Sequence, residues 1–175
     1  MSRFIVFNLI ASIILSIAVQ DQFTLTEVVR DYDPLKNVTS VRTTETTLSG
    51  PKDRYHSLAY SIYYSYPGKT PTPPRDVNFE IVSVVKARRL NTDLYVVFVV
   101  DGKEIHYSSN RGAIRNPVRG KPWIGERMVF LIPREDFMKM AEAKTLGVKL
   151  GGVSFEFNDA ARSSIKDLAK TIRVT

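Results

Sequence analysis

Apolar residues recur along this chain mostly with the period of a β-strand. The clearest segment is 94–100, seven apolar residues rich in β-branched and aromatic side chains and followed by Asp101-Gly102. A short apolar run that ends in a turn predicts a strand buried on both faces. Asp-Gly favours a two-residue type I′ turn, because both central residues take positive φ. We therefore predict a hairpin whose second strand is 103–108.

Other segments also have a strand pattern. In 58–66 every second residue is large and apolar, which predicts a half-buried strand whose inward face carries Leu58, Tyr60, Ile62, Tyr64 and Tyr66. Residues 39–48 alternate poorly, so we expect an edge strand there. The remaining predicted strands are 78–86, 126–132, 146–150 and 153–157, the last two joined by Gly151-Gly152. Four prolines and a glycine make 67–76 a loop.

Two segments have helical spacing instead. Pro133 and the acidic residues after it suit a first helical turn, which predicts a short helix over 133–143. Asn158 is a favourable N-cap for a last helix over 158–172. Its apolar stripe comprises Ala161, Ile165, Leu168, Ala169 and Ile172.

Many short strands without βαβ alternation or internal repeats indicate a mainly β fold. We predict an antiparallel β-sandwich of about seven to nine strands with the two helices above, and an open β-barrel is the alternative. A length of 175 residues suits one domain, which we expect to occupy 38–175.

The N-terminus has the pattern of a signal peptide. Arg3 precedes an apolar stretch to residue 18, and Ser16 and Ala18 are small residues at the positions that a signal peptidase reads. We expect cleavage near Ala18 and export to the periplasm or the exterior, with 19–37 forming an N-terminal arm or spacer. An uncleaved membrane anchor is the alternative.

Composition narrows the possible chemistry. The chain has no cysteine, which excludes disulfides, thiolate catalysis and cysteine-based zinc sites, and for an exported protein favours a bacterial envelope domain. The formal net charge is +7, and removal of 1–18 leaves 24 − 18 = +6. A positive charge of this size indicates anionic partners only if it is clustered.

The predicted topology does cluster the charge. Hairpin-connected strands run antiparallel, so alternate loops share one end of a sandwich. The loops at one such end carry many basic residues against only Asp53 and Asp93. The longest is 109–125, and a loop of that length is usually functional or disordered. The candidate ligand-binding residues at this end are Arg54, His56, Arg88, Arg89, Arg111, Arg115, Arg119, Lys121 and Trp123.

These residue types suit an anionic ligand. Arginine binds carboxylates and phosphates through two parallel hydrogen bonds, and an aromatic ring nearby can stack on a sugar or a base. Trp123 can equally cap the core where the chain re-enters the sheet. An anionic glycan, a lipid head group or an acidic protein surface fits an exported protein better than nucleic acid, for which no recognition motif is present. We expect no cofactor and no metal, and membrane contact only through an uncleaved N-terminal segment.

The sequence has no catalytic motif. It lacks a Gly-x-Ser-x-Gly elbow, a phosphate-binding glycine loop and a dinucleotide fingerprint. Glu104 and His106 share one face of their strand, which is typical of a solvated sheet face. We therefore predict a non-enzymatic binding domain. The alternatives are an envelope interaction module that uses the 58–66 strand or a sheet edge, and an enzyme of unfamiliar type that uses His56 or His106.

Overall fold

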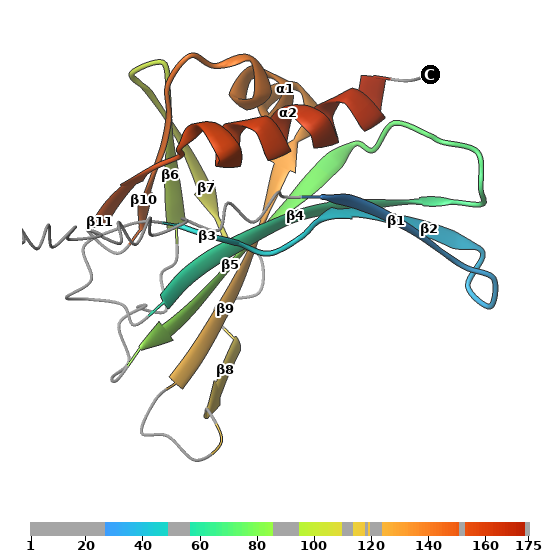
Figure 1. Cartoon of the computed structure of the whole chain (residues 1–175), viewed down its shortest axis with the longest axis horizontal. Coiled ribbons are helices and arrows are strands. Elements are labelled where there is room, and N and C mark those ends of the chain that lie inside the picture. Colours follow the sequence, from blue (N-terminus) through green and yellow to red (C-terminus); the bar gives the residue numbers. More distant parts are fainter. Residues whose placement is uncertain are drawn as a thin grey trace, which may run out of the picture.

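The protein is built mainly of antiparallel strands in two sheets, with two helices (Figure 1). A computed structural model describes residues 27–48, 57–85, 95–109, 114–117, 119, 124–150 and 153–173. Within them it contains eleven strands, all paired antiparallel. The prediction of a mainly β fold with a short helix and a C-terminal helix is confirmed, although the strand number exceeds the predicted seven to nine.

The larger sheet has seven strands and curls into a half-barrel. Its order is β1-β2-β4-β5-β9-β8, with β3 also paired to β4. These strands are β1 (Val28–Asp33), β2 (Val38–Thr43), β3 (Thr46–Thr47), β4 (Ser57–Pro67), β5 (Asp76–Val85), β8 (Ile114–Pro117) and β9 (Ile124–Pro133). The alternation predicted for 58–66 is confirmed, because all five predicted inward residues of β4 are buried.

The smaller sheet has four strands in the order β11-β10-β6-β7. They are β6 (Tyr95–Val100), β7 (Lys103–Ser108), β10 (Leu146–Leu150) and β11 (Val153–Glu156). The predicted type I′ turn between β6 and β7 is confirmed, since Asp101 and Gly102 have φ values of 47° and 81°. Burial on both faces holds only for the middle of β6, because Tyr95 at its start is 59% exposed.

Both predicted helices form. Helix α1 (Arg134–Glu142) follows β9 directly, and α2 (Asp159–Arg173) follows β11 and packs against α1. Asn158 caps α2, since its Oδ1 accepts a hydrogen bond from the Ala161 N–H at 2.9 Å. All five residues of the predicted apolar stripe of α2 are buried. No helix in the described part of the chain is long and apolar enough to span a membrane.

Aromatic side chains join the two sheets to α2. Phe79 of β5 stacks on Tyr60 of β4 at 5.4 Å between ring centroids, and its edge meets Phe98 of β6 at 4.9 Å. The Tyr60 hydroxyl lies 3.3 Å from the Ser164 hydroxyl of α2. Burial of each large apolar side chain contributes about 1.5–3 kcal/mol, so this cluster accounts for a large part of the stability.

Three strand predictions need correction. Val28–Asp33, within the predicted arm 19–37, forms β1, and β1 pairs with β2. The predicted edge strand over 39–48 is interior in its first part, because β2 pairs with β1 on one side and β4 on the other, whereas β3 pairs with β4 alone. The predicted loop 109–125 contains β8, which pairs with β9. In each case pairing with a neighbouring strand makes a strand of residues whose own pattern is weak.

Candidate functional site

Three segments rich in lysine and arginine, which we call the basic segments, are 49–56, 86–94 and 109–123. The strands that flank them meet at one end of the seven-stranded sheet. Ser57, where β4 begins, pairs with Val84 near the end of β5. Val85 pairs with Ile124 at the start of β9, and Ile124 also pairs with Pro117 at the end of β8. We call this end of the sheet the basic end. The prediction that alternate loops leave from one end therefore holds for the strands of this sheet.

The two sheets are offset from each other. Ser109 follows the end of β7. Its hydroxyl donates a hydrogen bond of 3.2 Å to the carbonyl of Val129, a residue in the middle of β9. The smaller sheet therefore ends partway along β9, while β9, β5 and β8 continue to the basic end (Figure 1). The ends of the strands of the smaller sheet therefore do not reach the basic end, although β6 and β7 connect to it through 86–94 and 109–113.

The structure describes two of the nine predicted ligand-binding residues. Arg119 lies two residues beyond β8 and is exposed, and the backbone of Arg115 lies within β8. The other seven, namely Arg54, His56, Arg88, Arg89, Arg111, Lys121 and Trp123, lie outside the described residues.

Two polar residues that sequence reasoning missed lie in the core at the basic end. Ser83 of β5 and Glu126 of β9 are both 0% exposed, and they are direct partners in the β5–β9 register. The Ser83 hydroxyl makes no hydrogen bond in the described part of the protein. Leu58 pairs with Ser83, and Arg115 pairs with Glu126, so one row of register partners crosses β4, β5, β9 and β8.

A buried carboxylate imposes an electrostatic requirement on its surroundings. Removing an ion from water costs several kcal/mol, so a buried carboxylate persists when a cation and hydrogen-bond donors compensate it. Glu126 lies on the inward face with Met128, Phe130 and Ile132, all of which are buried. The basic end therefore combines a buried carboxyl group with the segments richest in positive charge.

The alternation of β9 contained the signal for Glu126. Met128, Phe130 and Ile132 define the apolar face, and stepping back two residues places Glu126 on it. Ser83 likewise shares its face with Phe79 and Ile81. Polar residues at inward positions of otherwise apolar strands were therefore visible in the sequence, although we interpreted Glu126 only as the first residue of a strand.

The outer face of the smaller sheet carries the second group of polar side chains. His106 lies 3.6 Å from Glu104, and the Lys149 ammonium donates to the Glu104 carboxylate at 2.5 Å. This hydrogen bond from Lys149 holds the pKa of Glu104 below its usual value. The Tyr95 ring stacks on the His106 ring, with 6.3 Å between the ring centroids. His106 and Glu104 are both well exposed, so the pair lies on an open face, as the sequence predicted.

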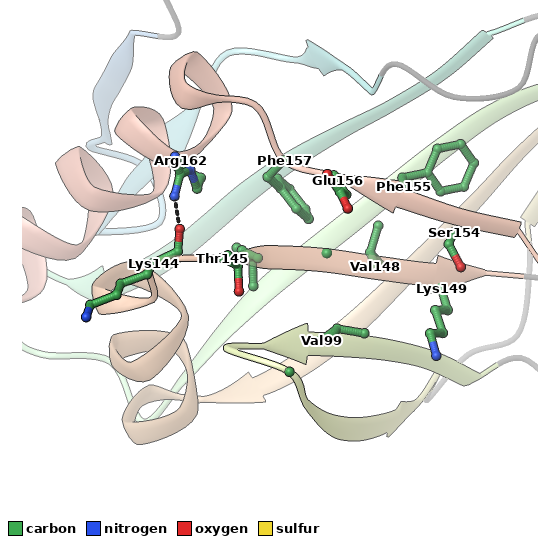
Figure 2. Close-up of a pocket in the computed structure, with 13 residues that line it drawn as sticks. Val99, Lys144, Thr145, Val148, Lys149, Ser154, Phe155, Glu156, Phe157 and Arg162 are labelled. Carbon is green, nitrogen blue, oxygen red and sulfur yellow. Dashed lines mark hydrogen bonds between the residues drawn. The ribbon is translucent and has the colours of Figure 1, made fainter.

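A hollow of about 500 Å³ lies beside this group, over Val99 and Gly147 (Figure 2). Two of its three basic side chains bind other groups of the protein. Arg162 donates to the Lys144 carbonyl and to Asp159, and Lys149 donates to Glu104. The Lys144 ammonium points away from the hollow in Figure 2. The hollow therefore does not combine its positive charges into an anion site.

Metal binding finds no support in the described residues, which contain no cluster of three or more histidine, cysteine or acidic side chains able to hold an ion. Comparisons of the chain with protein-family models, curated proteins and solved structures give no match.

Proposed function

We propose that this protein is an exported, non-enzymatic domain that binds an anionic ligand or partner at the basic end. The observation that carries the proposal is the convergence of strand ends there. The start of β4, the end of β5, the start of β9 and the end of β8 are mutual register partners. The segments 49–56, 86–94 and 109–123 are each attached to this group of strand ends.

The charge distribution supports the same proposal. These three segments contain nine lysines and arginines and only two acidic residues. The rest of the chain holds 16 basic and 16 acidic residues, so the three segments account for the whole net charge of +7. A charge needed only for solubility has no reason to concentrate in this way. Concentrated positive charge raises the local concentration of anions and speeds their association.

The proposed ligand classes follow from the proposed location. The signal-like segment 1–18 supports export, and an exported basic surface meets anionic glycans, lipid head groups and acidic protein surfaces. Binding by surface cations releases counterions, so affinity falls steeply as salt increases.

The test compares two triple variants of the protein. One, Arg88→Ala/Arg89→Ala/Arg119→Ala, removes charge from the basic segments. The control, Arg30→Ala/Arg42→Ala/Arg134→Ala, removes the same charge from exposed positions elsewhere. Binding to dextran sulfate and to phosphatidylglycerol vesicles is measured across a salt series. The proposal requires binding that salt weakens and that only the first variant loses. Equal binding by the two variants, or no binding by the wild type, overturns it.

The alternative function is a structural or protein-interaction module of the envelope. Its predicted contact surface, the tyrosine-rich strand, is corrected by the structure, because Tyr60, Tyr64 and Tyr66 of β4 are buried in the core. Only the sheet edges then remain for that alternative. We therefore place it second.

A further inference from the structure

We propose that the tip of the β1–β2 hairpin is a membrane contact, which inserts the Leu35 side chain into the outer part of a bilayer containing anionic lipids. The hairpin tip comprises residues 34–37, with 67–70 of the loop after β4 beside them. Leu35 is 97% exposed, whereas Tyr95, the next most exposed large apolar residue in the described part of the chain, is 59% exposed. The proposal does not rest on the proposed anion-binding function, since the hairpin tip lies at the opposite end of the larger sheet.

The first argument is the position of the hairpin tip. β4 begins at Ser57 near the basic end and ends at Pro67, which pairs with Val38 directly after the hairpin tip. The eleven residues of β4 separate the two ends by about 30 Å along the strand. Figure 1 shows the hairpin reaching out at the right of the view, away from the smaller sheet. A lipid surface accepts a projecting tip, whereas a small ligand needs a concave site.

The second argument is that hydrogen bonds fix the backbone of the hairpin tip. The Asp33 carboxylate accepts the N–H of Leu35 at 2.9 Å and the N–H of Lys36 at 3.2 Å. The Asn37 carbonyl accepts the N–H of Gly68 at 2.8 Å, which ties the hairpin to the loop after β4. The turn therefore presents Leu35 outward before any partner arrives, and its insertion costs little additional ordering of the backbone.

The third argument is the charge around Leu35. The hairpin tip contains Lys36 and Lys69 and no acidic residue. The Lys36 side chain is 79% exposed, and the Lys69 ammonium lies 4.8 Å from the centre of the Tyr32 ring. The nearest carboxylates lie below the hairpin tip, since Asp33 is bound to the turn and Asp31 is in the middle of β1. Each lysine close to an anionic membrane strengthens binding about fivefold.

The size of the apolar surface favours lipid over a protein partner. A specific protein interface buries about 800 Å² on each partner, far more than one leucine side chain supplies. Full burial of a leucine side chain strengthens binding at least about tenfold. One leucine and two lysines therefore suit weak, reversible attachment to a surface that offers many equivalent sites, as a bilayer does.

Vesicle binding of full-chain variants tests the role of Leu35. Partitioning is measured on vesicles of mixed phosphatidylglycerol and phosphatidylcholine, and binding is measured on dextran sulfate, a polyanion without an apolar phase. Leu35→Ala should lower vesicle partitioning about tenfold and leave dextran sulfate binding unchanged. The matched control is Leu131→Ala, because Leu131 is an exposed leucine of β9, and it should change neither. Equal effects of the two substitutions overturn the proposal.

The two lysines are tested with a second pair of variants. Lys36→Ala/Lys69→Ala should lower partitioning about tenfold or more on vesicles rich in phosphatidylglycerol and change it little on pure phosphatidylcholine. Lys103→Ala/Lys170→Ala removes the same charge from exposed positions elsewhere and should lower it less. All variants come from the same expression host as the wild type, so any contribution of 1–18 is equal in each. An equal loss in the two double variants overturns the proposal.

A fluorescent label locates the contact. The chain has no cysteine, so Leu35→Cys provides a single site for an environment-sensitive dye. Lipids that carry a nitroxide should quench the dye at position 35 but not the dye in the control variant Lys103→Cys, at the start of β7. If neither dye is quenched on vesicles that bind the protein, the proposal fails and the basic end keeps its proposed function. If only the dye at position 35 is quenched and the wild type does not bind dextran sulfate, the proposed function fails and the membrane contact stands.

Discussion

Asp101 and Thr145 exchange two hydrogen bonds between the β6–β7 turn and the connection from α1 to β10. The Asp101 N–H donates to the Thr145 carbonyl at 3.0 Å, and the Thr145 N–H donates to the Asp101 carboxylate at 2.8 Å. The Lys144 N–H donates to the same carboxylate oxygen at 2.9 Å. This turn therefore fixes the chain between the C-terminal end of α1 and the smaller sheet.

We predict that Asp101→Asn lowers stability in a pH-dependent way. The hydrogen bond from the Thr145 N–H is the main reason that the pKa of Asp101 is lowered from 3.8. Because the folded pKa lies below the unfolded one, the charge stabilises the protein above pH 3.8, and this stabilisation is lost as the pH falls through the folded pKa. The difference in urea midpoint between wild type and variant should therefore be largest near neutral pH and vanish in strong acid. A difference that is independent of pH contradicts this.

Asparagine is the appropriate substitution because it tolerates the positive φ of 47° at this position. Asp101→Ala adds backbone strain and should be less stable than Asp101→Asn at every pH. Equal stability of the two variants would show that the turn does not hold this conformation.

We predict that Phe79→Ala destabilises the protein by about 3–5 kcal/mol. Phe79 is buried and contacts rings from both sheets and from the segment before α2, so truncation opens a cavity where the layers meet. Denaturant unfolding measures the loss. Leu35→Ala is the control, because Leu35 is 97% exposed and should change stability by less than about 0.5 kcal/mol. A small effect of Phe79→Ala would mean that the sheets do not pack through this ring.

Local chemistry explains which parts of the fold the sequence could predict. The turn at Asp101-Gly102, the cap Asn158 and the stripe of α2 depend on residues close together in the chain. β8 does not, since its four residues include a proline and become a strand through pairing with β9. β1 has no clean alternation and depends in the same way on β2. Their strand state comes from pairing with the next strand along the chain, which the residue pattern within each segment does not show.

The candidate site was likewise predictable only where the order of the strands along the chain determines it. The antiparallel order of the hairpins was enough to predict that the strand ends flanking the basic segments meet at one end of a sheet. The backbone register that places position 115 opposite Glu126 depends on β8, a strand that was not predicted at all. Shifting that register by one residue would place a different residue of β8 opposite Glu126, so only the three-dimensional pairing determines this neighbour.

We predict that Gly147→Ala destabilises the protein more than Gly125→Ala. A Cβ on Gly147 would lie 3.1 Å from the Phe155 carbonyl oxygen, so the backbone of β11 has to shift. A Cβ on Gly125 would make an ordinary contact of 3.6 Å with the Asn116 carbonyl oxygen. Thermal unfolding of the two variants gives the comparison. If Gly147→Ala is neutral, β11 is free to move away from β10, and the hollow beside them is not a fixed feature.

The last prediction concerns the N-terminus. If 1–18 is a cleaved signal peptide, the protein expressed in a bacterial host with its full sequence is released from the membrane and begins at Val19 or close to it. Its formal charge is then +6, since Arg3 is the only charged residue removed. Mass spectrometry of the released protein measures both the cleavage site and the mass. Ala18→Leu is the informative variant, because a large residue at this position blocks processing by a signal peptidase, which requires a small one. Recovery of the wild type at full length in the membrane fraction would instead establish the N-terminal anchor, and binding at the basic end would then take place at a membrane surface.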